Sequence, residues 1–149
     1  MPEHLALSVD VDADAARTWA AVTDWVGQAQ WMVGTTVAVT AGDGASVGST
    51  LAARTALGPA GFLDTMTITA WDPPRSCSVL HTGRVVRGTG HFEVTPLGPD
   101  RSRFSWAEVL ELPLGAVGRA GWPVVRPLFV AGVRRSLARF AAWAPTRAR

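Results

Sequence analysis

Two carboxylates lie among apolar residues on strand faces that alternation predicts to be buried. In residues 104–112 the alternation puts Glu108 on the apolar face, and in residues 62–70 it puts Asp64 in the same position. A carboxylate inside an apolar cavity must be paired, hydrated or protonated. We therefore expect Asp64 and Glu108 to bind a polar part of a ligand or to act as acid and base. The structural alternative is a side chain that reaches water at a strand end or bulge, or that pairs with Arg54.

His81 and His91 fall on neighbouring predicted strands, where two histidines can transfer protons or bind metal. Parity places His91 opposite Phe92 and so toward solvent, whereas His81 shares a face with Val79 and can reach the interior. Two histidines without a third clustered ligand make a poor zinc signature. We expect neither a metal nor another cofactor, and we expect Cys77 to be a small core residue rather than a nucleophile.

Apolar residues on the same faces are predicted to form the wall of a cavity. Trp106 shares the inward face of Glu108, and Met66 and Ile68 continue the face of Asp64 at steps of two. Trp122, beside a proline, can line the pocket mouth, and Phe129, on the apolar stripe of the last helix, can face the interior. The candidate ligand-binding residues are therefore Asp64, Met66, Ile68, His81, Trp106, Glu108, Trp122 and Phe129.

The elements that position these residues are mostly strands. Alternating apolar residues separated by Gly, Pro and Asp turns are typical of an antiparallel sheet. The pattern predicts strands over residues 4–12, 35–40, 50–57, 62–71, 76–82, 89–95 and 103–112. The dipeptide Asp43-Gly44 suits a tight hairpin, and Gly98-Pro99-Asp100 is expected to close the last one.

Three helices complete the prediction. The first covers residues 13–25, begins at the carboxylates of Asp12 and Asp14, and places Ala16, Trp19, Val22 and Val26 on one side. A second, short helix is expected at residues 28–32. The third covers residues 116–143, with Pro123 and Pro127 bending or delaying it. Its apolar stripe consists of Val125, Phe129, Val133, Leu137, Phe140 and Ala144.

Composition limits the classes of function. A chain of 149 residues is most simply one domain over residues 1–149. The formal charge is +2 and every cation is Arg, without a basic run, so we expect no nucleic-acid partner. The acidic start of the chain and the lack of a long apolar run predict neither a signal peptide nor stable membrane insertion. A lone cysteine and these absences favour a reducing cytoplasm as the location.

The order of several short motifs along nearly the whole chain resembles the START-like (SRPBCC) superfamily, in particular its polyketide cyclase/dehydrase-like bacterial branch. Each motif is short, and the specific signal is their order. They are residues 11–19 (VDADAARTW), 22–25 (VTDW), 68–75 (ITAWDPPR), 88–94 (GTGHFEV), 104–106 (FSW), 112–115 (LPLG) and 134–140 (RRSLARF).

The resemblance implies an α+β helix-grip fold, in which a seven-stranded antiparallel sheet curls around a long C-terminal helix and two short helices close one end. It also implies a hydrophobic cavity between sheet and helix. The family includes lipid carriers, hormone receptors, aromatase/cyclases, quinone-binding proteins and chaperone activators.

Three functions follow as hypotheses. The first is binding or carriage of a small hydrophobic ligand, lipid-like or aromatic and polyketide-like, in an internal cavity. The second is a polyketide aromatase/cyclase or dehydratase. The third is a protein-interaction module without a ligand. No catalytic motif of the aromatase/cyclases can be placed on this chain, and the sequence contains no tyrosine, so whether the protein is an enzyme stays open.

Overall fold

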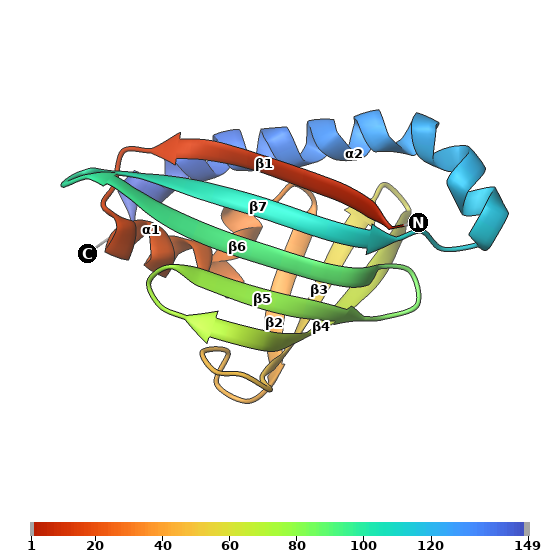
Figure 1. Cartoon of the computed structure of the whole chain (residues 1–149), viewed down its shortest axis with the longest axis horizontal. Coiled ribbons are helices and arrows are strands. Elements are labelled where there is room, and N and C mark those ends of the chain that lie inside the picture. The colour runs from red at the N-terminus through yellow and green to blue at the C-terminus, as the bar shows by residue number, and fades with distance from the viewer. Residues whose placement is uncertain (1, 148–149) are drawn as a thin grey trace.

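The computed structural model describes residues 2–147 and contains a seven-stranded antiparallel sheet with a long C-terminal helix (Figure 1). The expected helix-grip architecture is therefore confirmed. The strands are β1 (Glu3–Val11), β2 (Thr35–Ala41), β3 (Thr50–Leu57), β4 (Ala60–Asp72), β5 (Ser76–Thr82), β6 (Arg87–Gly98) and β7 (Arg101–Glu111). The helices are α1 (Ala15–Val22), α2 (Gly115–Trp143) and the 3-10 segments η1 (Val26–Gln30) and η2 (Ala144–Thr146).

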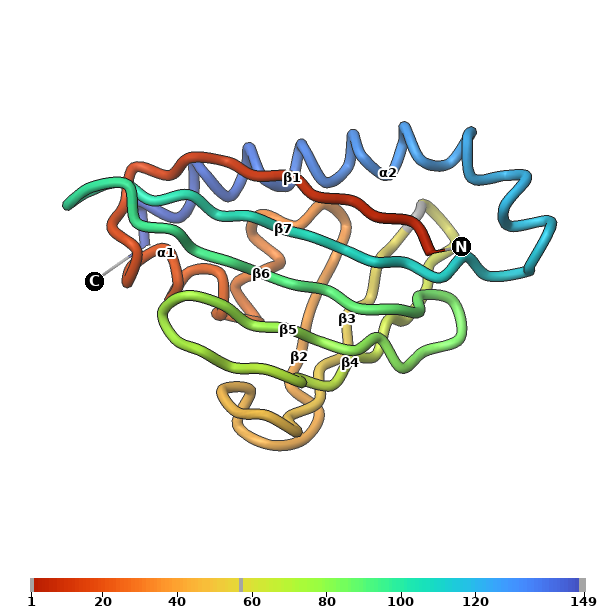
Figure 2. The backbone as a smooth tube through the Cα atoms, in the orientation of Figure 1, coloured from red at the N-terminus to blue at the C-terminus, as the bar shows by residue number. Residues whose placement is uncertain are grey.

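The sheet has the order β1-β7-β6-β5-β4-β3-β2, so chain neighbours are sheet neighbours except at β1 and β2. These two strands form opposite edges, and α1 and η1 connect them. The sheet curls strongly, and β2 and β3 cross behind β5 and β6 at a steep angle (Figure 2). Because α1 contacts β6 and β7 while η1 contacts β2, the connection lies on the concave face and closes one part of it.

Strand β4 contains a bulge that changes the predicted parity. Ile68 pairs with Val79 of β5, but Ala70 pairs with Ser78, so one residue is inserted between the two pairs. As a result Ala70, which alternation in residues 62–70 would place on the inward face after Ile68, is exposed, whereas Trp71 packs against the core. The bulge lies after the polar residue of interest, Asp64, whose inward direction it leaves unchanged.

The N-terminal helix is shorter than expected. Asp14 is its N-cap, and its carboxylate accepts a hydrogen bond from the backbone N–H of Arg17 at 2.7 Å. Trp19 is buried as predicted, but Ala16, in the first turn of the helix, is exposed. Val26 is exposed as well, because the helix ends at Val22 and the chain continues as the 3-10 segment η1. The second short helix, expected at residues 28–32, corresponds to this segment.

The loop between β2 and β3 is not the tight hairpin that Asp43-Gly44 suggested. It covers residues 42–49, and the Asp43 carboxylate accepts hydrogen bonds from the backbone N–H of Ala45 and the hydroxyls of Ser46 and Ser49. This network holds Gly44 where its carbonyl accepts a hydrogen bond from Trp25 Nε1 at 2.8 Å. The loop therefore fixes an aromatic ring of the interior.

The second half of α2 covers the sheet, whereas its first half extends past the strand ends (Figure 1). Val133, Leu137 and Phe140, in the second half of the helix, are buried in the core, but Val125, predicted on the same stripe and located in the first half, is half exposed. Pro123 and Pro127 do not delay the helix and lie inside it. Phe140 packs edge-on against Trp31, with ring centroids 4.9 Å apart, and so joins α2 to the η1 region.

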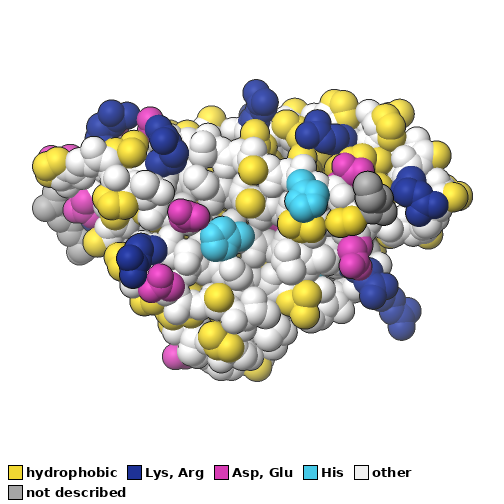
Figure 3. Space-filling model, in the orientation of Figure 1, with side chains coloured by type: hydrophobic (Ala, Val, Ile, Leu, Met, Phe, Trp, Pro, Cys, Tyr) yellow, Lys and Arg dark blue, Asp and Glu magenta, His cyan; other side chains and the backbone are white. Residues whose placement is uncertain are grey.

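The outer face of the sheet mixes acidic, basic and histidine side chains with apolar ones and shows no patch of a single charge (Figure 3). None of the helices among residues 2–147 is long and apolar enough to cross a membrane.

The docking of α2 leads to a stability prediction. Leu137→Asp and Phe140→Asp would each bury an unpaired carboxylate and should lower the free energy of unfolding by roughly 3 kcal/mol or more. Leu128 lies on the same helix but is 73% exposed, so Leu128→Asp is the matched control and should change stability by no more than about 0.5 kcal/mol. Urea denaturation measures all three. Equal midpoints for Leu137→Asp and Leu128→Asp would contradict the docking of α2.

Candidate functional site

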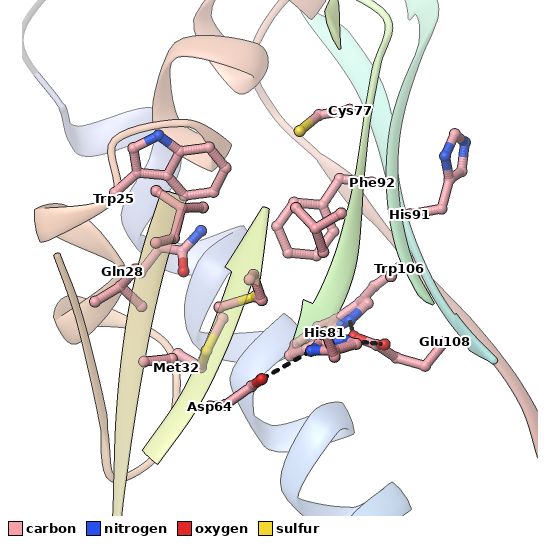
Figure 4. Close-up of a pocket in the computed structure, with 16 residues that line it drawn as sticks. Trp25, Gln28, Met32, Asp64, Cys77, His81, His91, Phe92, Trp106 and Glu108 are labelled. Atoms are coloured by element: carbon pink, nitrogen blue, oxygen red, sulfur yellow. Dashed lines mark hydrogen bonds and ion pairs between the residues drawn. The ribbon is translucent and has the colours of Figure 1, made fainter. Parts of the chain in front are cut away.

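A partly open cavity of about 70 Å³ lies between the concave face of the sheet and the segment around η1. Most of its wall is apolar and comes from strands β2 to β7, while Trp25, Gln28 and Met32 close it from the helical side (Figure 4). No residue of α2 lines it. The long helix therefore stabilises the core beside the cavity instead of forming its wall.

Three ionisable side chains meet at one end of this cavity (Figure 4). His81 Nδ1 lies 2.8 Å from Asp64 Oδ1, and His81 Nε2 lies 2.9 Å from Glu108 Oε2. Trp106 Nε1 donates to the other oxygen of Glu108 at 2.9 Å. We call Asp64, His81, Trp106 and Glu108 the polar cluster. Each of its members was predicted to face inward or to be able to reach the interior, and the structure brings all four together.

The sheet register explains this arrangement. Met66 is paired with His81, so Asp64 is the next inward residue on β4 and meets His81 diagonally. Glu108 belongs to β7 and must reach across β6 to touch His81 on β5. It does so over Gly90, which pairs with Glu108 on one side and with Val79 on the other.

Gly90 is a functional residue that sequence reasoning missed. A Cβ at this position would lie 3.1 Å from each carboxylate oxygen of Glu108 and 3.1 Å from Val79. The missing side chain therefore provides the space through which Glu108 reaches His81. Even Ala would crowd the carboxylate, and a larger side chain would displace it.

The charge of His81 follows from its two partners. Burial alone lowers the pKa of His81, but the hydrogen bonds and negative charges of Asp64 and Glu108 outweigh burial and raise the pKa from 6.5 to about 9. At neutral pH the ring is therefore an imidazolium that donates both N–H groups to carboxylates. The Arg54 pairing considered for Asp64 does not form, since Asp64 pairs with His81 instead.

The remaining sequence-predicted candidates divide into two groups. Met66 lines the cavity together with the polar cluster. Ile68 is fully buried in the core one step away, and Trp122 and Phe129 pack against each other on α2, with ring centroids 6.3 Å apart. The structure thus does not place Ile68, Trp122 or Phe129 in the cavity wall.

Other lining residues were not on the candidate list. Val79 and Cys77 share the parity of His81, and Phe92 lies opposite His91, so period-2 alternation contained a signal for all three. Burial raises the pKa of the Cys77 thiol to about 12, so it stays protonated, as expected of a core residue. The His91 side chain points away from the cavity, as predicted (Figure 4).

A second hollow, of about 540 Å³, is more open and lies where β5, β6 and β7 meet the loop near residue 83. Apart from His81, its polar lining is exposed to solvent and consists of Thr82, Arg87, Thr89 and Glu111. Water competes for exposed polar groups, so the smaller and less open cavity is the stronger candidate site. Within residues 2–147, no group of three or more His, Cys, Asp or Glu is arranged to hold a metal ion.

Comparison with known proteins agrees with this architecture. Residues 2–144 match the family described as polyketide cyclase/dehydrase and lipid transport. The chain belongs to this family. No curated protein matches the chain at a significant level.

Solved structures with the same fold share little sequence with this polyketide cyclase/dehydrase family member. The Zhui aromatase/cyclase from Streptomyces sp. R1128 is 19% identical with a TM-score of 0.76, over 100% of this chain and 97% of that one. A START superfamily protein from Mycobacterium smegmatis is 16% identical with a TM-score of 0.77, over 95% and 97%. A protein from Thermus thermophilus is 15% identical with a TM-score of 0.81, over 95% and 97%. At these identities the likeness shows the fold alone.

The raised pKa of His81 predicts how stability depends on pH. Because the pKa of the folded state lies above that of the unfolded state, the contribution is fully present below about pH 6.5 and is lost as the pH rises through about 9. The difference in unfolding free energy between the parent protein and His81→Gln should therefore shrink by about 3 kcal/mol between pH 6 and pH 10. Urea denaturation at pH 6, 8 and 10 measures it.

His91→Gln is the control for this experiment, because that side chain lies on the outer face and is partly exposed. Its effect on stability at pH 6 should be small compared with that of His81→Gln. A difference between parent and His81→Gln that is equal at pH 6 and pH 10 would show that His81 is not held as a cation.

Proposed function

We propose that this protein binds a small, largely apolar molecule in the cavity beside η1, holds its polar part at the polar cluster, and releases it unchanged. The observation that carries this proposal is the combination of an apolar wall with one buried, hydrogen-bonded cluster at its end. Such a combination is typical of ligand sites, in which apolar contacts supply affinity and a few polar groups fix orientation.

The size of the cavity favours a small aromatic molecule over a long lipid. A volume of about 70 Å³ is well below the roughly 300–1,000 Å³ of pockets for drug-sized ligands. Met32 and Met66 both line the wall, and methionine side chains adapt their shape readily. A ligand somewhat larger than the resting cavity can therefore be accommodated by rotation of these two side chains.

The bonding of His81 favours binding over catalysis. A general base needs a free lone pair within reach of the proton that it removes. Both ring nitrogens of His81 are already hydrogen-bonded to carboxylates, and its raised pKa keeps both protonated at neutral pH. His81 therefore holds the carboxylates of Asp64 and Glu108 in place and has no lone pair free to accept a proton.

A polyketide aromatase/cyclase or dehydratase is the alternative, and two observations favour it. The family to which the chain belongs is named for cyclase and dehydrase activity as well as lipid transport. A cavity residue with a strongly shifted pKa beside carboxylates is also a common property of active sites. In that case the protonated His81 would be the acid, and Asp64 or Glu108 the base.

Ligand binding can be followed through tryptophan fluorescence. Titration with phenol and with 2-naphthol should give saturable quenching in the parent protein, because Trp106 lines the cavity. Trp106→Phe should reduce this quenching, and the part that remains should come from Trp25, which also lines the cavity. Trp122→Phe, on a helix that does not line the cavity, is the matched control and should keep it. Absence of saturable binding by either compound, or equal quenching in all three proteins, would contradict the proposal.

Product analysis separates binding from catalysis. The protein is incubated with linear polyketide mimics, and the mixture is analysed by mass spectrometry. Unchanged mimics are expected. Cyclised or dehydrated products that disappear in Asp64→Asn, His81→Gln or Glu108→Gln would establish the enzymatic alternative in place of simple binding.

A further inference from the structure

We infer that the cavity selects a ligand that brings its own hydrogen-bond donors and a positive charge, namely an organic ammonium on a small apolar or aromatic body. This inference rests on the proposed binding function and adds the chemical class of the ligand. It is carried by the balance of donors, acceptors and charges around the cavity.

In the cavity lining, the indole N–H groups of Trp25 and Trp106 and one of the two amide N–H groups of Gln28 are directed to protein acceptors. Trp25 Nε1 donates to the carbonyl of Gly44 at 2.8 Å, and Gln28 Nε2 donates to the carbonyl of Val22 at 3.0 Å. Trp106 Nε1 donates to Glu108. The lining contributes few free donors, so a ligand that needs donors, such as a carboxylate or phosphate, finds little to bind it.

The two nitrogens of His81 follow the same rule. One donates to Asp64 at 2.8 Å and the other to Glu108 at 2.9 Å. The imidazolium therefore offers no N–H to a ligand. To give one up, it would have to break a charge-assisted hydrogen bond to a buried carboxylate, which is among the stronger interactions in a protein.

The carboxylates of Asp64 and Glu108, in contrast, have unused positions for accepting hydrogen bonds. Each carboxylate oxygen can accept about two hydrogen bonds. Within the described residues, the Asp64 side chain accepts a hydrogen bond only through Oδ1, from His81. Each Glu108 oxygen accepts a single bond. The side chains of Asp64 and Glu108 are only 14% and 13% exposed, so bulk water has little access to these unused acceptor positions.

The charge balance points the same way. The cavity wall contains two carboxylates and one imidazolium, and neither Arg nor Lys lines it among the described residues, so the ionised cluster carries a net charge of −1. An uncompensated charge in an apolar, partly dehydrated site is costly, and a bound cation removes that cost. A bound anion would increase it.

Aromatic rings complete the site for a cation. Trp25, Phe92 and Trp106 all line the cavity. Ring faces attract organic ammonium groups, and tryptophan does so most strongly. The same rings pack against an aromatic body, so one small molecule with an aromatic ring and an ammonium group satisfies both the polar cluster and the wall.

The test uses three probes that share a benzyl group and differ in charge: benzylamine, benzyl alcohol and phenylacetate. Isothermal titration calorimetry at pH 7 and low salt measures their affinities. Benzylamine should bind about tenfold to a hundredfold more tightly than benzyl alcohol, since hydrogen bonds to charged groups are stronger than neutral ones. Phenylacetate should bind more weakly than benzyl alcohol.

Variants assign this preference to the cluster. Asp64→Asn and Glu108→Gln keep the shape but remove one charge each, so each should reduce the advantage of benzylamine over benzyl alcohol to less than about threefold. Glu111→Gln removes an exposed carboxylate from the same strand as Glu108 and should leave the advantage unchanged. The parent protein's affinities alone test the inference if a variant fails to fold.

The outcomes separate this inference from the proposed function. If benzyl alcohol binds but benzylamine has no advantage, or if phenylacetate binds most tightly, the charge selectivity is wrong and the binding function stands. An advantage of benzylamine that survives both Asp64→Asn and Glu108→Gln also overturns the inference, because the cluster would not be its source. If none of the three probes binds saturably, the binding function fails and the inference fails with it.

Discussion

The imidazolium of His81, held between two carboxylates inside an apolar sheet, is the interaction on which the rest of the site depends. Buried charges are tolerated only when they are paired and hydrogen-bonded. The pairing here requires side chains from β4, β5 and β7 to converge, and a shift of one residue in any of these strands would turn its member to the outer face. Pairing within the cluster therefore favours one register of these strands, and only that register brings the members of the cluster together.

Gly90 shows how closely fold and site are linked. The carboxylate of Glu108 crosses an intervening strand to reach its partner, and it can do so only because that strand lacks a side chain at the crossing point. The helical segments differ in what they contribute to the site. The segment around η1 borders the cavity, while α2 packs beside it and supplies core contacts through its second half. Changes in α2 should thus act on stability before they act on the cavity wall.

Alternation along single strands was sufficient to place Asp64, Trp106 and Glu108 inside, and to show that His81 could reach the interior. It failed at Ala70, because a bulge cannot be recognised from parity. The helical period likewise placed Val125 on the buried stripe, although its side chain is half exposed. The pairing of the cluster could not be predicted, since it depends on register between strands. The sequence also did not reveal that Trp25, Gln28 and Met32 line the cavity, since the 3-10 segment η1 has no regular apolar period.

The same geometry limits the chemistry that the cavity can perform. If His81 gave its proton to a substrate, a neutral ring would be left between two buried carboxylates, and one of its two hydrogen bonds would lose its donor. Proton donation from this cluster is therefore unfavourable unless a positive charge develops or is brought close to Asp64 and Glu108 at the same time. A ligand that carries an ammonium group supplies that charge on binding. Cation binding and any acid catalysis by His81 thus share one physical requirement. A positive charge must compensate the negative charge of the second carboxylate.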